Sequence, residues 1–88
     1  APVRFRAESG EWLNNIDVTH ALSRFALAQW TLRQDRDGAF ELRASAGDAR
    51  ELERALRQLF GATARIGVTV NALFDGKVRQ YQSELVPP

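Results

Sequence analysis

The chain has 88 residues, of which 44% are hydrophobic and 26% are charged, and its net charge at neutral pH is +1. These values are those of one small globular domain. The charges are interleaved and nearly balanced, so composition gives no reason to expect binding to nucleic acid or to an acidic membrane surface. No apolar run approaches the ~20 residues of a membrane span.

Cysteine is absent and there is a single histidine. Disulfides and thiolate metal sites are therefore excluded, and no metal site is expected. The lack of cysteine also permits a cytoplasmic location, which we expect for this protein. The first residue is alanine, and we expect the whole chain, 1–88, to be a single domain cut from a longer protein.

The N-terminal segment predicts a short β-hairpin. Val3, Phe5 and Ala7 alternate with charged residues, and the Ser9-Gly10 turn signal separates this run from the segment 11–14. So short a hairpin has no core of its own. We therefore expect it to pack on a neighbour, and that neighbour could lie outside this chain.

A short amphipathic helix is predicted next, from about Val18 to Phe25, because apolar residues recur there at helical spacing. Asp17 is the expected N-cap. His20 lies off the apolar stripe and is expected to face solvent.

Residues 27–34 and 39–45 alternate between apolar and polar side chains around the turn 35–38, which predicts an antiparallel hairpin. Trp30 and Phe40 fall on the apolar side and are expected in the core. The opposite, open face would then have no aromatic platform on which RNA bases could stack.

The clearest helix begins after Asp48, with Glu51 in the arrangement of a capping box, and ends at Gly61. Its arginines alternate with acidic residues, and Glu53 can pair with Arg57 at i,i+4. This face is therefore expected to be a solvated surface.

Residues 63–72 alternate strictly and predict a strand, whereas Val78 to Leu85 alternates weakly and fits a strand or a short helix. The order of these elements predicts an α+β fold, a small two-layer sandwich. We expect a three-stranded, mainly antiparallel sheet covered by two helices, with the N-terminal hairpin beside it. The other face of the sheet would carry Gln29, Thr31, Arg33, Glu41, Arg43, Thr69 and Asn71.

Lys77 is the only lysine among 12 basic residues, and it follows the turn signal Asp75-Gly76. The plain interpretation is a solvated lysine on a loop of an arginine-rich chain. The residues needed for a nucleophilic triad or a glycine-rich phosphate loop are absent, however. A single flexible ammonium on a loop would suit a domain that contributes one cation to a site built elsewhere.

The stretch 68–80, which contains Gly76-Lys77-Val78-Arg79, resembles the end of the adenylate-forming enzymes, the acyl- and aryl-CoA ligases and related synthetases. The resemblance is closest to the phenylacetate-CoA ligases and the capsule-biosynthesis adenylating proteins. Their small C-terminal domain has a similar order of elements along nearly the whole chain. The Gly-Arg-x-x-Asp hinge signature of the family is absent, and the loop before Gly76 lacks the common Pro-Arg-Thr/Ser run.

The resemblance implies a mobile lid domain, inactive alone, whose partner is its own N-terminal adenylation domain. That domain would bind ATP with Mg²⁺ and the carboxylic acid substrate. Gly76 and Lys77 match the family's Gly-Lys, so they would contact ATP, and Lys77 would be catalytic. The acyl acceptor could be coenzyme A, a carrier protein or an amine.

Two other functions stay open. The first is a non-catalytic α+β regulatory or protein-interaction module that self-associates through its open sheet or an edge strand, or binds a small ligand. The second, a nucleic-acid binder, is disfavoured by the balanced charge and by the expected lack of open-face aromatics.

Overall fold

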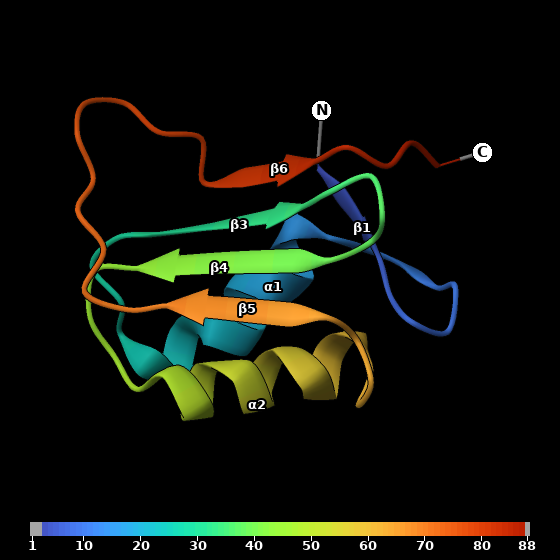
Figure 1. The fold of residues 1–88 in the computed structure, drawn as a ribbon, viewed down its shortest axis with the longest axis horizontal. Coiled ribbons are helices and arrows are strands. Elements are labelled where there is room, and N and C mark those ends of the chain that lie inside the picture. The colour runs from blue at the N-terminus through green and yellow to red at the C-terminus, as the bar shows by residue number, and fades with distance from the viewer. Residues whose placement is uncertain (1–2, 88) are drawn as a thin grey trace.

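The computed structural model describes residues 3–87 and shows an α+β fold in which two helices pack against sheets (Figure 1). None of the helices in that range is long and apolar enough to cross a membrane. The elements in chain order are β1 (Arg4–Arg6), β2 (Trp12–Asn14), α1 (Asn15–Leu22), the 3₁₀ turn η1 (Ser23–Phe25), β3 (Trp30–Gln34), β4 (Phe40–Ala44), α2 (Ala49–Phe60), β5 (Ile66–Thr69) and β6 (Tyr81–Ser83).

The main sheet has four strands in the order β5-β4-β3-β6, so the expectation of three strands was wrong. The extra strand is β6, which lies within the segment that fitted a strand or a short helix. The expectation of mainly antiparallel pairing was also wrong. The hairpin β3–β4 is antiparallel, but β5 runs parallel to β4 and β6 parallel to β3. Helix α2 supplies the crossover connection that parallel pairing of β4 and β5 requires.

Both helices and the inner face of the sheet contribute to one core. Val18 and Leu22 of α1 are buried, as are four residues on one side of α2. From the sheet, alternate residues of β3 and β4 point inward, as the sequence pattern predicted. The buried apolar residues are Phe5, Ala7, Val18, Leu22, Leu32, Phe40, Leu42, Ala44, Leu52, Ala55, Leu56 and Phe60.

The N-terminal hairpin is confirmed, since β1 and β2 pair antiparallel as a separate two-stranded sheet. It packs on this chain's own core, with no need of another domain. Phe5 is 0% exposed and its ring lies 6.1–6.2 Å from the rings of Phe40, Phe60 and Tyr81. Aromatic pairs in such tilted and edge-on arrangements add to the stabilisation that burial provides.

A buried glutamine joins this hairpin to the main sheet. Gln34, at the end of β3, is 1% exposed. Its Oε1 accepts a hydrogen bond from the backbone N–H of Arg6 (2.8 Å), and its Nε2 donates to the carbonyl oxygens of Arg6 (2.9 Å) and Gly38 (3.1 Å). The side-chain amide thus satisfies backbone groups of β1 that have no strand partner at that position.

The hairpin turn is also tied to the end of α2. The N–H of Glu8 donates to the carbonyl oxygen of Phe60 (2.7 Å), and the Glu8 carboxylate accepts from the N–H of Thr63 (2.9 Å). Gly61 lies between these contacts at φ +131°, where a Cβ atom would be 2.6 Å from the Cβ of Glu8. Glycine is therefore required at this position by both its conformation and the close approach.

The predicted N-terminus was correct for one helix and wrong for the other. Helix α2 begins after Asp48, as predicted, and Oδ1 of that residue accepts from the N–H groups of Arg50 and Glu51. Helix α1 begins at Asn15, so the expected start at Val18 with Asp17 as the cap was wrong. Asn14 is the cap, and Asp17 instead accepts from the N–H of Asn14 in a reciprocal capping box.

Candidate functional site

The loop of residues 70–80 carries the Asp75-Gly76-Lys77 sequence and crosses the sheet from β5 at one edge to β6 at the other. Figure 1 shows it arching outward beyond the end of β4 and the start of β3. Asn71, two residues after the end of β5, has a left-handed φ of +59°. The loop is then fixed near its two ends, by the Ala72 N–H on the Ala44 carbonyl (2.9 Å) and the Leu32 N–H on the Gln80 carbonyl (2.8 Å).

Between these two anchors, the turn holding the lysine is open to solvent. The side chains of Asp75 and Lys77 are exposed, and Lys77 forms no ion pair with any residue of the described range 3–87. Gly76 adopts φ +64°, and a Cβ built on it would have no heavy atom within 4 Å. Glycine therefore suits this turn because of its left-handed backbone conformation, and not because a side chain would lack space.

Apolar side chains flank the lysine. Leu73 is 86% exposed and Val78 is 48% exposed. Phe74 lies beneath the guanidinium of Arg43, whose Cζ is 5.5 Å from the ring centroid. Arg43 belongs to the open face of the sheet, so that face does have one aromatic neighbour, supplied by the loop. The sequence pattern places no aromatic side chain among the strand residues of that face, and Phe74 comes from the loop rather than from a strand.

The loop also forms one wall of a groove on the open face, of about 560 Å³. Its charged lining includes Arg33 and Arg43 from the sheet and Arg79 from the loop, together with Asp35 and Glu41. Both signs of charge are therefore present. Lys77 is not among the lining residues, whereas Val78, its neighbour along the chain, is.

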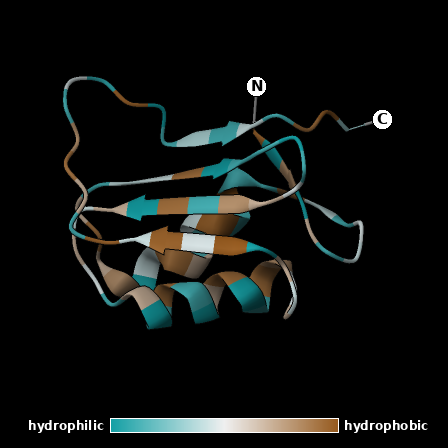
Figure 2. Ribbon diagram, in the orientation of Figure 1, coloured by the Kyte–Doolittle hydropathy of each residue, from teal (hydrophilic) through white to brown (hydrophobic). Residues whose placement is uncertain are grey.

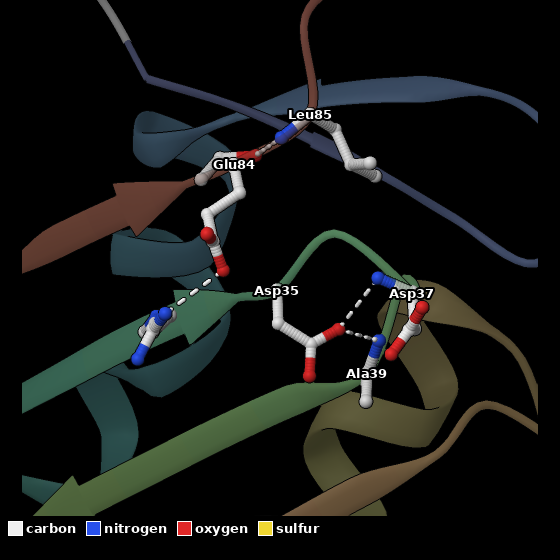
Figure 3. Close-up of polar contacts among 7 residues, drawn as sticks. Asp35, Asp37, Ala39, Glu84 and Leu85 are labelled. Atoms are coloured by element: carbon white, nitrogen blue, oxygen red, sulfur yellow. Dashed lines mark hydrogen bonds and ion pairs between the residues drawn. The ribbon is translucent and has the colours of Figure 1, made fainter.

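Two of the groove's charged groups, Arg33 and Asp35, already have partners, and Figure 3 shows the contacts of Asp35. Arg33 pairs with Glu84 (Nη2 to Oε2, 2.8 Å), an exposed ion pair that contributes at most about 1 kcal/mol to stability. Asp35 accepts hydrogen bonds from the N–H groups of Asp37 (2.9 Å) and Ala39 (3.0 Å) and so shapes the β3–β4 turn. A structural role accounts for Asp35.

The remaining sequence candidates are separate from this loop. His20 is exposed near the end of α1, as expected, and its carbonyl oxygen accepts from the hydroxyl of Ser23. The predicted pair of Glu53 and Arg57 is confirmed at 3.2 Å. Within residues 3–87 no group of three His, Cys, Asp or Glu side chains could hold a metal ion.

Tyr81, the first residue of β6, joins the loop's second anchor to the core. Its hydroxyl forms a hydrogen bond with the Thr19 hydroxyl, and its ring packs edge-on against Trp30 at 5.1 Å between centroids. Burial raises the pKa of the Tyr81 hydroxyl above its ordinary value, and the Thr19 hydrogen bond partly opposes this. The phenol therefore stays protonated at neutral pH and acts as a structural group.

The sequence singled out Lys77 and Gly76, and the structure places both in the exposed turn between the two anchors of the loop. It did not identify Phe74, Val78 and Arg79 as companions on the sheet face. Comparison of the chain with protein-family models, with curated proteins and with solved structures found no match in any of the three.

Proposed function

We propose that this chain is the mobile C-terminal domain of an ATP-dependent adenylate-forming ligase and that Lys77 stabilises formation of the acyl-adenylate. The observation that supports this proposal is the exposed position of the Lys77 side chain. It is an exposed cation, without an ion pair among residues 3–87, on an anchored loop that projects from the sheet. Such a group is available to a site on another domain, and the described residues provide no complete site around it.

In the proposed reaction, a carboxylate oxygen of the acid attacks the α-phosphorus of ATP, and the bond from that phosphorus to the pyrophosphate oxygen breaks. Negative charge increases on the oxygens around the phosphorus and on the departing pyrophosphate. The Lys77 ammonium would donate to these oxygens as the charge develops, which is the form of electrostatic stabilisation that lowers the barrier of the step. The compact ammonium suits this role because its three donors can rotate on a flexible stem.

The neighbouring residues fit a loop that enters another domain. Gly76 has an open surrounding and no side chain, so its backbone can approach a phosphate closely. Leu73 and Val78 expose apolar surface on either side of the turn, and apolar surface of this kind favours contact with a partner. The proposed partner is the ligase's own N-terminal adenylation domain.

That N-terminal domain would bind most of ATP, the carboxylic acid and Mg²⁺, since the described residues contain no cluster of ligands for a metal ion. Coenzyme A, a carrier protein or an amine would be the acyl acceptor. The proposal includes a cytoplasmic location, which the absence of cysteine permits.

The experiment uses the protein with its N-terminal domain and follows acyl-adenylate formation by exchange of labelled pyrophosphate into ATP. Lys77→Ala should lower the rate by about 10²–10³-fold, the usual effect of removing one group that stabilises developing charge. Arg36→Ala is the matched control, because Arg36 is also an exposed cation in a turn but lies between β3 and β4. It should leave the rate unchanged.

The circular dichroism spectrum and unfolding midpoint should be unaltered in both variants, because both side chains are exposed. Normal adenylation by a folded Lys77→Ala protein would overturn the proposal. So would an equal loss in the Arg36→Ala control, because a nonspecific effect of charge would then explain the result.

A further inference from the structure

Strand β5 forms one edge of the four-stranded sheet, and within residues 3–87 it pairs only with β4. Both described ends of the chain lie beside β6, at the opposite edge (Figure 1). An edge strand presents a row of unpaired backbone groups, and soluble proteins commonly protect such edges with charge, proline or a bulge.

The strand register shows which backbone groups of β5 are unpaired. Phe40 donates its N–H to the carbonyl oxygen of Arg65 (2.8 Å), and Gly67 and Thr69 lie opposite Glu41 and Arg43. The groups of residues 65, 67 and 69 therefore point toward β4. Because backbone groups alternate in direction along a strand, those of Ile66 and Val68 point away from the sheet. Val70, directly after the strand, continues the alternation.

The side chains make this edge different from the edge at β6. Ile66, Val68 and Val70 are half-buried and pack against the core, and residues 66–70 include no charge and no proline. Figure 2 shows β5 brown at its apolar residues, whereas β6 is pale to teal. The β6 segment has the Arg33–Glu84 ion pair beside it. Residues 81–83 of β6 also include no charge and no proline, so the two edges differ in the apolar row of β5 and in the ion pair beside β6.

We propose that the β5 edge binds a second copy of this chain, with the two β5 strands antiparallel about a two-fold axis at Val68. Val68 then faces its equivalent and Ile66 faces Val70 of the other copy. In this register every backbone group of residues 66–70 that points away from β4 forms a hydrogen bond with the other copy. The apolar side chains of Ile66, Val68 and Val70 from the two copies then lie side by side on one face of the joined sheet. Arg65 falls opposite Asn71, so no like charges meet across the interface.

The lack of charge along β5 favours a second copy of this chain as the binding partner. A charged peptide would find no complementary charge on residues 66–70, whereas another β5 offers an uncharged strand with the same alternation. An interface made by one short strand pair is smaller than the roughly 1,200–2,000 Å² of stable complexes. The dimer should therefore be weak and dependent on concentration. The proposal does not depend on the function proposed for Lys77.

The test measures the mass of the chain by sedimentation equilibrium from about 10 μM to 1 mM, a range that detects dissociation constants of weak complexes. The wild-type mass should rise toward that of a dimer. Val68→Lys and Val68→Glu should each raise the dissociation constant at least about tenfold, because like charges then lie opposite each other. An equal mixture of the two variants should regain the dimer, since opposite charges now meet.

Val86→Lys is the matched control and should behave like wild type, because Val86 is 84% exposed and follows β6, the strand at the other edge. A monomeric wild type at the highest concentration would overturn the proposal. It would also be overturned if the folded lysine variant still dimerised, or if the mixture of two folded variants stayed monomeric.

Hydrogen exchange on the wild type tests the same interface without any substitution. The amides of Ile66 and Val68 should become more protected as concentration rises. Those of Gly67 and Thr69 should be protected at every concentration, because they face β4. Exchange of Ile66 and Val68 that is independent of concentration, together with a rising mass, would place the interface elsewhere.

Discussion

The N-terminal hairpin and the lysine loop are both attached to the same sheet, but they are held in different ways. The hairpin is attached through buried contacts, with the Phe5 ring in the core and the Gln34 amide bonded to β1. The loop is held near its ends by backbone hydrogen bonds, while its central turn contacts little. Both segments form few strand hydrogen bonds with the main sheet. The hairpin is nevertheless part of the core, whereas the loop is a projecting arm.

The difference has consequences for stability and for binding. Replacing a residue at the hairpin junction removes burial or leaves polar groups unpaired, so the free energy of unfolding should fall. Replacing a residue in the central turn of the loop removes exposed surface, so folding should be preserved and only contacts with a partner should change. Matched substitutions in the two regions test this contrast directly.

The largest loss is expected for Phe5→Ala. The substitution opens a cavity between Phe40, Phe60 and Tyr81, and such changes cost about 3–5 kcal/mol. Urea unfolding followed by circular dichroism would measure it. Phe74→Ala is the control in the loop, where loss of the Arg43 contact should cost only about 0.5–1 kcal/mol. Equal losses in the two variants would contradict the contrast between the regions.

Gln34→Ala should have the next largest effect. It leaves the N–H and C=O of Arg6 and the carbonyl of Gly38 without this partner in a part-buried junction, which should cost about 1–3 kcal/mol. Exchange of the Arg6 amide should also become faster. Gln82→Ala, at an exposed position of β6, should change stability by less than about 0.5 kcal/mol. An unchanged Arg6 amide in Gln34→Ala would show that the Gln34 amide does not hold the hairpin in place.

Gln34 also shows where sequence patterns are insufficient. It lies two residues after Leu32, at an inward position of β3, although glutamine side chains are mostly exposed in proteins. Only the three-dimensional placement of β1 shows what the amide binds. A polar residue at an inward position of a strand is the signal that could have identified the junction.

The strands and helices with strong periodicity were predictable, because burial of one face imposes a regular pattern. The hairpin β3–β4 and helix α2 follow that rule. β6 was ambiguous because it is a short edge strand with one partner, so few of its residues need to be apolar. The start of α1 was misplaced because Asn14 and Asp17 are both good capping residues. Their reciprocal bonds, rather than residue preference, decide which is the cap.

At the candidate site, the sequence identified the lysine and missed its surroundings. Lys77 stands out by composition and by the turn before it, neither of which depends on the fold. The contact of Phe74 with Arg43 and the groove beside Val78 depend on how the loop returns across the sheet. Those contacts join residues far apart in the chain, and local patterns do not encode them.

The smallest effect is expected for Leu73→Ala, and it sharpens the comparison most. Leu73 is 86% exposed, so the substitution should change the free energy of unfolding by less than about 0.5 kcal/mol. The same substitution at Leu52, which is 0% exposed, should cost about 2–5 kcal/mol. Denaturant unfolding of both variants measures the difference. If Leu73→Ala destabilised the chain by more than about 1 kcal/mol, the loop would be packed in solution, and its description as a projecting arm would fail.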